Sequence, residues 1–257
     1  HSATVATRLA GSGALANTLP LNAIKVEDTE RISCGIPELD RVLGGGIMNR
    51  SCVLIGGEPG IGKSTLLLQS AAANASKGRV LYISGEESAE QIRQRADRLE
   101  LSGERIEVFC SGELASILKV LERIKPAIIV VDSVQTLHSA DIGLVPGTVN
   151  QMKYCSMELV SWAKERGSAL FLVAHVTKEG FIAGPKALEH MVDCVLYFEQ
   201  NETEHRFIRA VKNRFGSVDE LGIFVMGEKG LISQDENAAL FLIPREGPPP
   251  AGVATAA

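Results

Sequence analysis

The sequence predicts an α/β fold with a mostly parallel central sheet and helices on both faces. Short apolar runs alternate with helix-like segments along most of the chain, and a glycine-rich turn joins the first run to the first helix. Several runs are apolar throughout rather than alternating, which is typical of strands buried on both faces. The length of 257 residues suits one large α/β domain or two small ones.

The predicted elements follow one another from near residue 51 to near residue 227. The predicted strands are 51–57, 79–84, 105–110, 127–133, 168–176, 194–199, 205–213 and 222–227, the last two ending the sheet like a hairpin. The predicted helices are 63–77, 88–100, 113–125 and 149–167. Residues 1–23 and 245–257 are rich in small residues, Pro and Gly, so we expect a tail or linker on each side of a core over 24–244.

Composition excludes some classes of protein. Hydrophobic residues make up 45% and charged residues 22%, an ordinary globular mix, and the formal net charge is −5. A nucleic-acid contact must therefore come from a local basic patch. No run approaches the roughly 20 apolar residues of a membrane span, and the N-terminal stretch lacks the pattern of a signal peptide. We therefore expect a cytoplasmic protein with no membrane partner.

The cysteines indicate neither a zinc site nor a redox motif. The five are far apart and none forms a C-x-x-C pair. Such scattered thiols suit a reducing cytosol, where most act as small buried hydrophobic residues. They are Cys34, Cys52, Cys110, Cys155 and Cys194.

The stretch "GEPGIGKS" at 57–64 fits the pattern G-x-x-x-x-G-K-[ST] and lies between a predicted strand and a predicted helix. In that context the pattern predicts a P-loop, whose backbone N–H groups surround phosphates at a helix N-terminus. Lys63 would reach the β- and γ-phosphates, and Ser64 would bind Mg²⁺. A chance match in a glycine-rich turn is the alternative. The candidate ATP-binding residues are Gly57, Glu58, Pro59, Gly60, Ile61, Gly62, Lys63, Ser64 and Thr65.

Polar side chains end three of the apolar strands. Asp132 closes "AIIVVDS" and is a candidate to hold Mg²⁺ through water, the Walker B position; the alternative is an Asp that caps a loop. Glu86 and Glu87 follow the second strand, where one could activate the attacking water, or both could simply begin a helix. His175 could sense the γ-phosphate or be a structural residue.

Lys212 and Arg214 lie two residues apart in "VKNRFG", after a short apolar run. Alternate positions of a strand point the same way, so both cations would face one target. Within a single chain no anion is evident for them. The alternative is that they are ordinary solvated surface residues.

Together these segments resemble the RadA (Sms) family of bacterial DNA-repair proteins, a branch of the RecA/DnaB-like ATPases. The resemblance rests on "GGEPGIGKSTLLLQ", "YISGEES", "VVDSVQTL", "VTKEGFIAGPKALEHMVDCVLYFE" and "VKNRFG". Residues 31–47, "RISCGIPELDRVLGGGI", resemble a segment shared with KaiC. The resemblance to the RadA family implies a RecA-like P-loop ATPase core that forms a hexameric ring around single-stranded or branched DNA. It places ATP between subunits and implies a recombinase as partner. It also implies helicase-like, DNA-dependent ATP hydrolysis that drives branch migration near the nucleoid.

The resemblance also implies roles for individual residues. Glu86 rather than Glu87 takes the position of the water-activating glutamate, and His175 links the γ-phosphate to a DNA loop. Lys212 and Arg214 would act on the ATP of the adjacent subunit, neutralising charge that develops on its γ-phosphate, or would contact DNA. Residues 138–151 and 177–186 would be loops facing the ring centre, with Lys178, Phe181 and Lys186 as candidate DNA contacts. Phe181 would either stack on a base or only anchor its loop.

The sequence departs from the family pattern at both ends. The four-cysteine zinc finger is missing from the start, and the chain stops about where a Lon-protease-like domain would begin. The prediction is therefore an ATPase core within a DNA motor. Two alternatives are a KaiC-like regulatory ring acting on protein partners, which "KNRFG" and "TKEG" disfavour, and an assembly module that binds ATP with negligible turnover, which Glu86 and His175 disfavour.

Overall fold

The computed structural model describes residues 31–143, 145–176, 183–200 and 205–234. The described strands form a nine-stranded sheet in the order β3-β2-β4-β5-β1-β6-β7-β8-β9. The strands are β1 Cys52–Gly57, β2 Val80–Ser84, β3 Ile106–Cys110, β4 Ile128–Asp132, β5 Ala169–His175, β6 Cys194–Gln200, β7 His205–Asn213, β8 Leu221–Gly227 and β9 Gly230–Ser233. The helices are α1 Pro37–Val42, α2 Lys63–Asn74, α3 Ala89–Arg98, α4 Leu114–Ile124, α5 Val149–Arg166 and α6 Ala183–Leu188, with 3-10 turns η2 Val134–Thr136 and η3 Ala140–Ile142.

The sheet is parallel from β3 to β6 and antiparallel from β6 to β9. β1 lies between β5 and β6 and pairs in parallel with both, while β7 runs back along β6. The carboxyl ends of β1, β2, β4 and β5 therefore share one edge of the sheet, the edge at which open α/β sheets bind ligands. The predicted mostly parallel α/β fold is confirmed.

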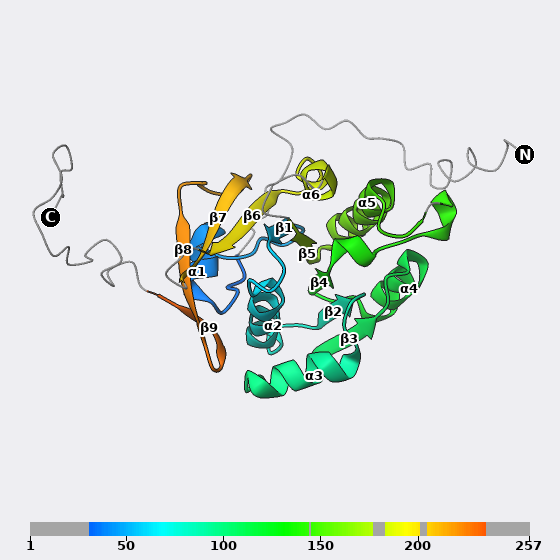
Figure 1. Cartoon of the computed structure of the whole chain (residues 1–257). Coiled ribbons are helices and arrows are strands. Elements are labelled where there is room, and N and C mark those ends of the chain that lie inside the picture. Colours follow the sequence, from blue (N-terminus) through cyan, green and yellow to red (C-terminus); the bar gives the residue numbers. More distant parts are fainter. Residues whose placement is uncertain (1–30, 144, 177–182, 201–204, 235–257) are drawn as a thin grey trace, which may run out of the picture.

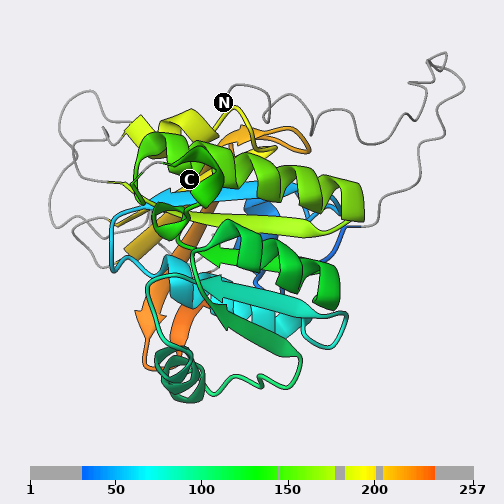
Figure 2. The same cartoon turned by 90° about the vertical axis from the view of Figure 1, so that its right-hand side faces the viewer.

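Helices cover both faces of the sheet, and each face has its own hydrophobic core. Alternate residues of β1 point to opposite sides: Val53 and Ile55 join one core, and Cys52 and Leu54 join the other. α1, α2 and α3 contribute to the first core, and α4, α5 and α6 to the second. Figure 1 shows the two groups of helices on opposite sides of the sheet, and Figure 2 shows α4 and α5 across one face.

Local sequence signals explain several helix ends. Ser88 and Gln91 form a reciprocal capping box that starts α3. Thr148 caps α5, and Gly167 ends it with a left-handed φ of 82°. Pro37 starts α1, where its missing N–H is not needed.

The structure adds to the predicted elements and corrects some of them. α1 and β9 were not predicted, and α2 ends at Asn74 rather than near residue 77. Part of the predicted loop 177–186 is wrong, because residues 183–186 belong to α6; Pro185 is tolerated there in the first helical turn. In the predicted loop 138–151, η3 forms and α5 begins at Val149. The predicted tails, 1–23 and 245–257, lie outside the described residues.

The cysteines behave as the composition indicated. All five are free, and four of them are buried, Cys110 being exposed. Within the described ranges, no helix is both long and apolar enough to cross a membrane.

Candidate functional site

The glycine-rich turn follows β1 directly and leads into α2, as the pattern predicted. Gly57 ends β1 so close to β6 that a Cβ atom there would lie 2.5 Å from the carbonyl oxygen of Phe198. Gly62 has a φ of 115°, a left-handed conformation that favours glycine, and it is the N-cap of α2. The turn therefore points the first N–H groups of α2 out of the carboxyl edge of the sheet, where they can bind an anion.

Lys63 is held inside this turn. Its Nζ donates to the carbonyl oxygens of Gly57, at 2.7 Å, and Glu58, at 2.8 Å, and the residue is only 3% exposed. Burial lowers the pKa of Lys63 to about 8, although the nearby carboxylates of Asp132, Glu86 and Glu58 act in the opposite direction. A buried ammonium with only carbonyl partners is prepared for an additional anion, which would stabilise its charge.

Asp132 lies at the end of β4, beside the P-loop. It is 5% exposed, and its Oδ2 accepts a hydrogen bond of 2.6 Å from the hydroxyl of Tyr82 on β2. Burial and the negative charge of Asp132 raise the pKa of Tyr82 well above its usual range, so the hydroxyl stays protonated and remains a donor. The hydroxyl of Tyr82 thus fixes one carboxylate oxygen of Asp132, and Asp132 lines the cavity beside the P-loop.

The two glutamates after β2 have different partners. The Oε1 of Glu86 lies 3.3 Å from Nε2 of His175 and also accepts a hydrogen bond from Ser133. Glu87 instead pairs with Arg95 of α3. Glu86 thus lies between the ends of β4 and β5, where it can accept a proton, whereas Glu87 anchors a helix.

His175 joins this group from the end of β5. Its Nδ1 is buried and has no hydrogen-bond partner among the described residues, and its backbone carbonyl accepts from Gln135 at 3.2 Å. A buried polar atom without a partner is uncommon in proteins and usually has a cause such as a ligand, a water molecule or a functional role.

These side chains surround one cavity of about 340 Å³. It is lined by Pro59, Gly60, Gly62, Lys63, Ser64, Thr65, Ser84, Glu86, Glu87, Arg95, Arg98, Asp132 and His175. A neighbouring cavity of about 440 Å³ shares Gly60, Gly62, Thr65 and Arg98 with it and extends to Arg206, Met226 and Gly230. Gly57, Glu58 and Ile61 are in the turn but do not line the cavity.

Sequence reasoning missed Tyr82, Ser84, Arg95 and Arg98. Tyr82 lies within an apolar strand, and Arg95 and Arg98 lie within the segment 88–100, which was predicted only as a helix. Their spacing of three residues, which places both on one side of α3, is the signal that could have found them.

The donor set fits a nucleoside triphosphate with Mg²⁺. Lys63 and the N-terminus of α2 offer positive charge and N–H donors to phosphates, and the residues expected to hold the metal, Ser64 and Asp132, both line the cavity. Hydroxyl and carboxylate oxygens are the ligands that Mg²⁺ prefers.

Lys212 and Arg214 lie at the opposite edge of the sheet. Because β7 runs back along β6, Asn213 pairs with Cys194, which is level with the start of β1. Cys194 pairs with Val53, and Gly57 is four residues further along β1, roughly 13 Å at the usual rise of a strand. Neither cation lines the P-loop cavity of its own chain.

The expectation that these cations have no anion within the chain is wrong for Arg214. Its Nη1 lies 3.1 Å from Oδ1 of Asp193. Lys212 donates to two backbone carbonyls, of Glu189 at 2.6 Å and Val192 at 2.7 Å. Burial and the charge of Arg214 lower the pKa of Lys212. Asp193 was not predicted as the partner of Arg214, because an Asp just before a strand resembles an ordinary loop residue.

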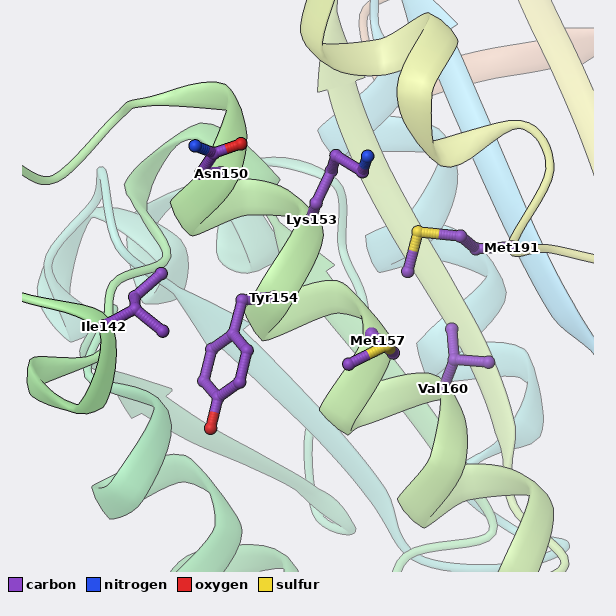
Figure 3. Close-up of a pocket in the computed structure, with 7 residues that line it drawn as sticks. All are labelled: Ile142, Asn150, Lys153, Tyr154, Met157, Val160 and Met191. Atoms are coloured by element: carbon purple, nitrogen blue, oxygen red, sulfur yellow. The ribbon is translucent and has the colours of Figure 1, made fainter. Parts of the chain in front are cut away.

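Of the candidate DNA contacts, Lys186 is exposed on α6, while Lys178 and Phe181 lie outside the described residues. A separate hollow of about 720 Å³ lies on the outer side of α5 (Figure 3). It shares no residue with the P-loop cavity and is lined by Ile142, Asn150, Lys153, Tyr154, Met157, Val160 and Met191. This hollow is therefore not part of the nucleotide site.

The parallel sheet, the P-loop and the carboxylates of Asp132 and Glu86 at the carboxyl edge of the sheet define a P-loop ATPase fold of the RecA/KaiC-like class. The ATPase family described as KaiC matches residues 32–109. The crystal structure of the KaiC-like protein PH0186 from Pyrococcus horikoshii OT3 is similar with a TM-score of 0.66 and 21% identity, covering 80% of this chain and 100% of that one. At that identity the likeness concerns the fold alone.

The expected resemblance to the bacterial DNA repair protein RadA is confirmed. The RadA of Treponema pallidum (strain Nichols) is 57% identical over 236 residues, 92% of this chain and 51% of that protein. The RadA proteins of Listeria monocytogenes and Bacillus subtilis are 46% and 49% identical, over 90% and 87% of this chain and 51% and 49% of their own lengths. The chain thus spans about half the length of the curated relatives it matches.

Proposed function

We propose that this chain is the ATP-hydrolysing core of a DNA-repair motor, in which each ATP is held by one subunit and completed by the next. The observation that carries the proposal is the division of charged groups between two edges of one sheet. Lys63, Asp132 and Glu86 gather at the carboxyl edge, and Lys212 and Arg214 lie at the amino edge. The names of the similar RadA proteins support the assignment to DNA repair.

Nucleotide binding relies on the P-loop. The triphosphate lies over the N-terminus of α2, Lys63 exchanges part of its contact with Gly57 and Glu58 for phosphate oxygens, and Ser64 and Asp132 hold Mg²⁺. Held by these residues, Mg²⁺ would neutralise negative charge on the phosphates. The adenine ring and the ribose of the nucleotide extend toward Arg98 and Met226 in the neighbouring cavity.

Hydrolysis requires a base for the attacking water. Glu86 is the proposed base, since it lines the cavity and its neighbour His175 can orient its carboxylate. Glu87 is unsuited to this role because Arg95 already neutralises it. His175 would also report the presence of the γ-phosphate to the residues that follow it in the sequence, among them the candidate DNA contacts Lys178, Phe181 and Lys186.

The second subunit supplies Lys212 and Arg214. A guanidinium contributed in this way stabilises charge that develops in the transition state and can raise the rate by about 10³–10⁵. Because the two edges of the sheet point in opposite directions, subunits must associate head to tail, as in a hexameric ring around single-stranded or branched DNA. Such a motor would supply the unwinding and branch migration that a recombinase needs.

The test is ATP hydrolysis at increasing protein concentration, with and without single-stranded DNA. We expect the rate per subunit to rise with both and to fall at least about a hundredfold in Glu86→Gln and Arg214→Ala. Mixing these two inactive variants should restore activity, since an Arg214→Ala subunit retains its own Glu86 and receives Arg214 from a Glu86→Gln neighbour. A mixture no more active than its components would refute sharing between subunits.

A second candidate is a KaiC-like regulatory ring that acts on protein partners without moving DNA. The match of residues 32–109 to the KaiC ATPase family favours it. Binding to DNA at low salt, where phosphate contacts are strongest, separates the two. No binding to single-stranded DNA there, together with normal hydrolysis, would support the regulatory ring.

A further inference from the structure

Asp193 lies at the centre of a small charged cluster at the amino edge of the sheet. It is 4% exposed, and its Oδ1 lies 3.1 Å from both Nη1 of Arg214 and Nζ of Lys164. Its Oδ2 accepts a hydrogen bond of 3.1 Å from the backbone N–H of Cys52. A carboxylate this deeply buried is costly unless charged donors satisfy it, and here two cations and a backbone N–H do so.

The backbone of Asp193 is fixed as well. Its N–H donates to the carbonyl of Cys52 at 2.9 Å, and its carbonyl accepts from the N–H of Arg214 at 3.0 Å. Asp193 therefore joins the first residue of β1 to the residue that follows β7. Arg214 is tied to this point twice, through its backbone and through its guanidinium.

The turn that carries Arg214 is held from the other side by Arg31. The Nη1 of Arg31 donates to the carbonyls of Leu43 at 2.9 Å and Gly46 at 3.2 Å, and its Nη2 donates to the carbonyl of Phe215. A Cβ atom on Gly44 would lie 3.4 Å from the Cα of Gly216, so the two turns also touch. The backbone beneath Arg214 is thus packed against the rest of the chain.

The guanidinium itself remains largely accessible. The side chain of Arg214 is 55% exposed, whereas that of Asp193 is 6% exposed. A guanidinium has five N–H donors, and Asp193 occupies one nitrogen from the buried side. The remaining donors can therefore bind a phosphate from the solvent side while the contact with Asp193 is kept.

We propose that Asp193 is a positioning residue that aims Arg214 at the γ-phosphate of the ATP bound by the adjacent subunit. This inference rests on the proposed function, in which Arg214 acts between subunits. A long side chain that is free to rotate loses conformational entropy when it meets its target, and anchoring it beforehand reduces that loss. Lys164 of α5 binds the same carboxylate oxygen and balances its charge.

The test is an Asp193→Asn variant, which keeps the shape of the side chain and an acceptor for Cys52 but loses the charge that holds Arg214. We expect kcat to fall about tenfold, while the affinity for a fluorescent ADP analogue stays within about twofold of the original, because the P-loop is untouched. The matched control is Lys164→Gln, which removes the other ion pair of the same carboxylate and should change kcat less than about twofold.

A double-mutant cycle separates positioning from a general structural role. In an Arg214→Ala background, Asp193→Asn should lower kcat by less than about a further twofold, because the guanidinium that Asp193 positions is already absent. Equal losses in both backgrounds would show that Asp193 only supports the fold and would overturn the inference. Original activity in Arg214→Ala itself would instead refute the proposed function. Loss in Arg214→Ala with no loss in Asp193→Asn would refute this inference alone.

Removal of a buried charge can prevent folding, so thermal denaturation and ADP binding are measured for each variant. Should Asp193→Asn not fold, Asp193→Glu keeps the charge but moves the carboxylate by one methylene. We expect the same fall in kcat with ADP binding retained, since the position of the carboxylate decides the effect. Hydrolysis by Asp193→Glu at the original rate would overturn the inference.

Discussion

Nucleotide binding should weaken as the pH rises from 7 to 9, because Lys63 titrates in this range. Burial gives Lys63 of the free site a pKa of about 8, and the phosphates of a bound nucleotide raise it again by stabilising the ammonium. Binding therefore favours the protonated lysine and takes up a proton whenever the free site has lost it. The affinity is unaffected below the pKa of the free site and falls above it.

The size of the effect follows from the fraction of free sites that are protonated. With a pKa of about 8, that fraction is about 90% at pH 7 and about 9% at pH 9. The affinity should thus fall about tenfold, or about 1.4 kcal/mol. Proton uptake per nucleotide should rise from about 0.1 to about 0.9 over the same range.

The assay is isothermal titration calorimetry with a non-hydrolysable ATP analogue and Mg²⁺, in two buffers of different ionisation enthalpy. Buried thiols do not interfere, since burial raises the pKa of both Cys52 and Cys194 to about 12. The control is Lys63→Gln, which should bind weakly and without this pH dependence. An affinity constant within twofold from pH 7 to 9, or equal proton uptake at both, would refute the reasoning.

Three other substitutions probe the support around the site. Tyr82→Phe removes the hydroxyl that binds Asp132; we expect a loss of about 1 kcal/mol of stability and a higher Mg²⁺ requirement, measured by urea denaturation and by nucleotide binding against Mg²⁺ concentration. Gly57→Ala places a methyl group against the carbonyl of Phe198, so it should lower the free energy of unfolding by about 1–3 kcal/mol and weaken nucleotide binding. Unchanged nucleotide binding by titration would contradict the steric argument. Ser88→Ala removes the cap of α3 and should lower stability by about 1 kcal/mol by urea denaturation, with no change in the content of the other helices.

Features encoded by neighbouring residues were predictable from the sequence. The P-loop, the strand ending in Asp132 and the helix beginning near Lys63 each depend on a few consecutive residues, and the structure places them as expected. The alternation of apolar strands with helices was enough to predict a parallel sheet covered on both faces.

Features that join distant segments were not predictable in this way. The contact of Tyr82 with Asp132 spans 50 residues, and that of Arg214 with Asp193 spans 21. Neither pair has a spacing that a helix or strand would impose, so only the assembled sheet brings them together. β9 is four residues long, too short to show a period.

The reversal of the chain between β6 and β7 has a consequence for counting active sites. It places Arg214 and the P-loop on opposite edges of one sheet, so under the proposed function a molecule cannot complete its own site. In an open row of n subunits acting as proposed, the site at one end would lack its guanidinium, and n − 1 sites would work. Closing the row gives the last site its missing partner. The ATPase rate per subunit would then rise gradually as a row lengthens and become constant once the row has closed into a ring. The rate per subunit would therefore report the fraction of subunits whose site lacks a partner.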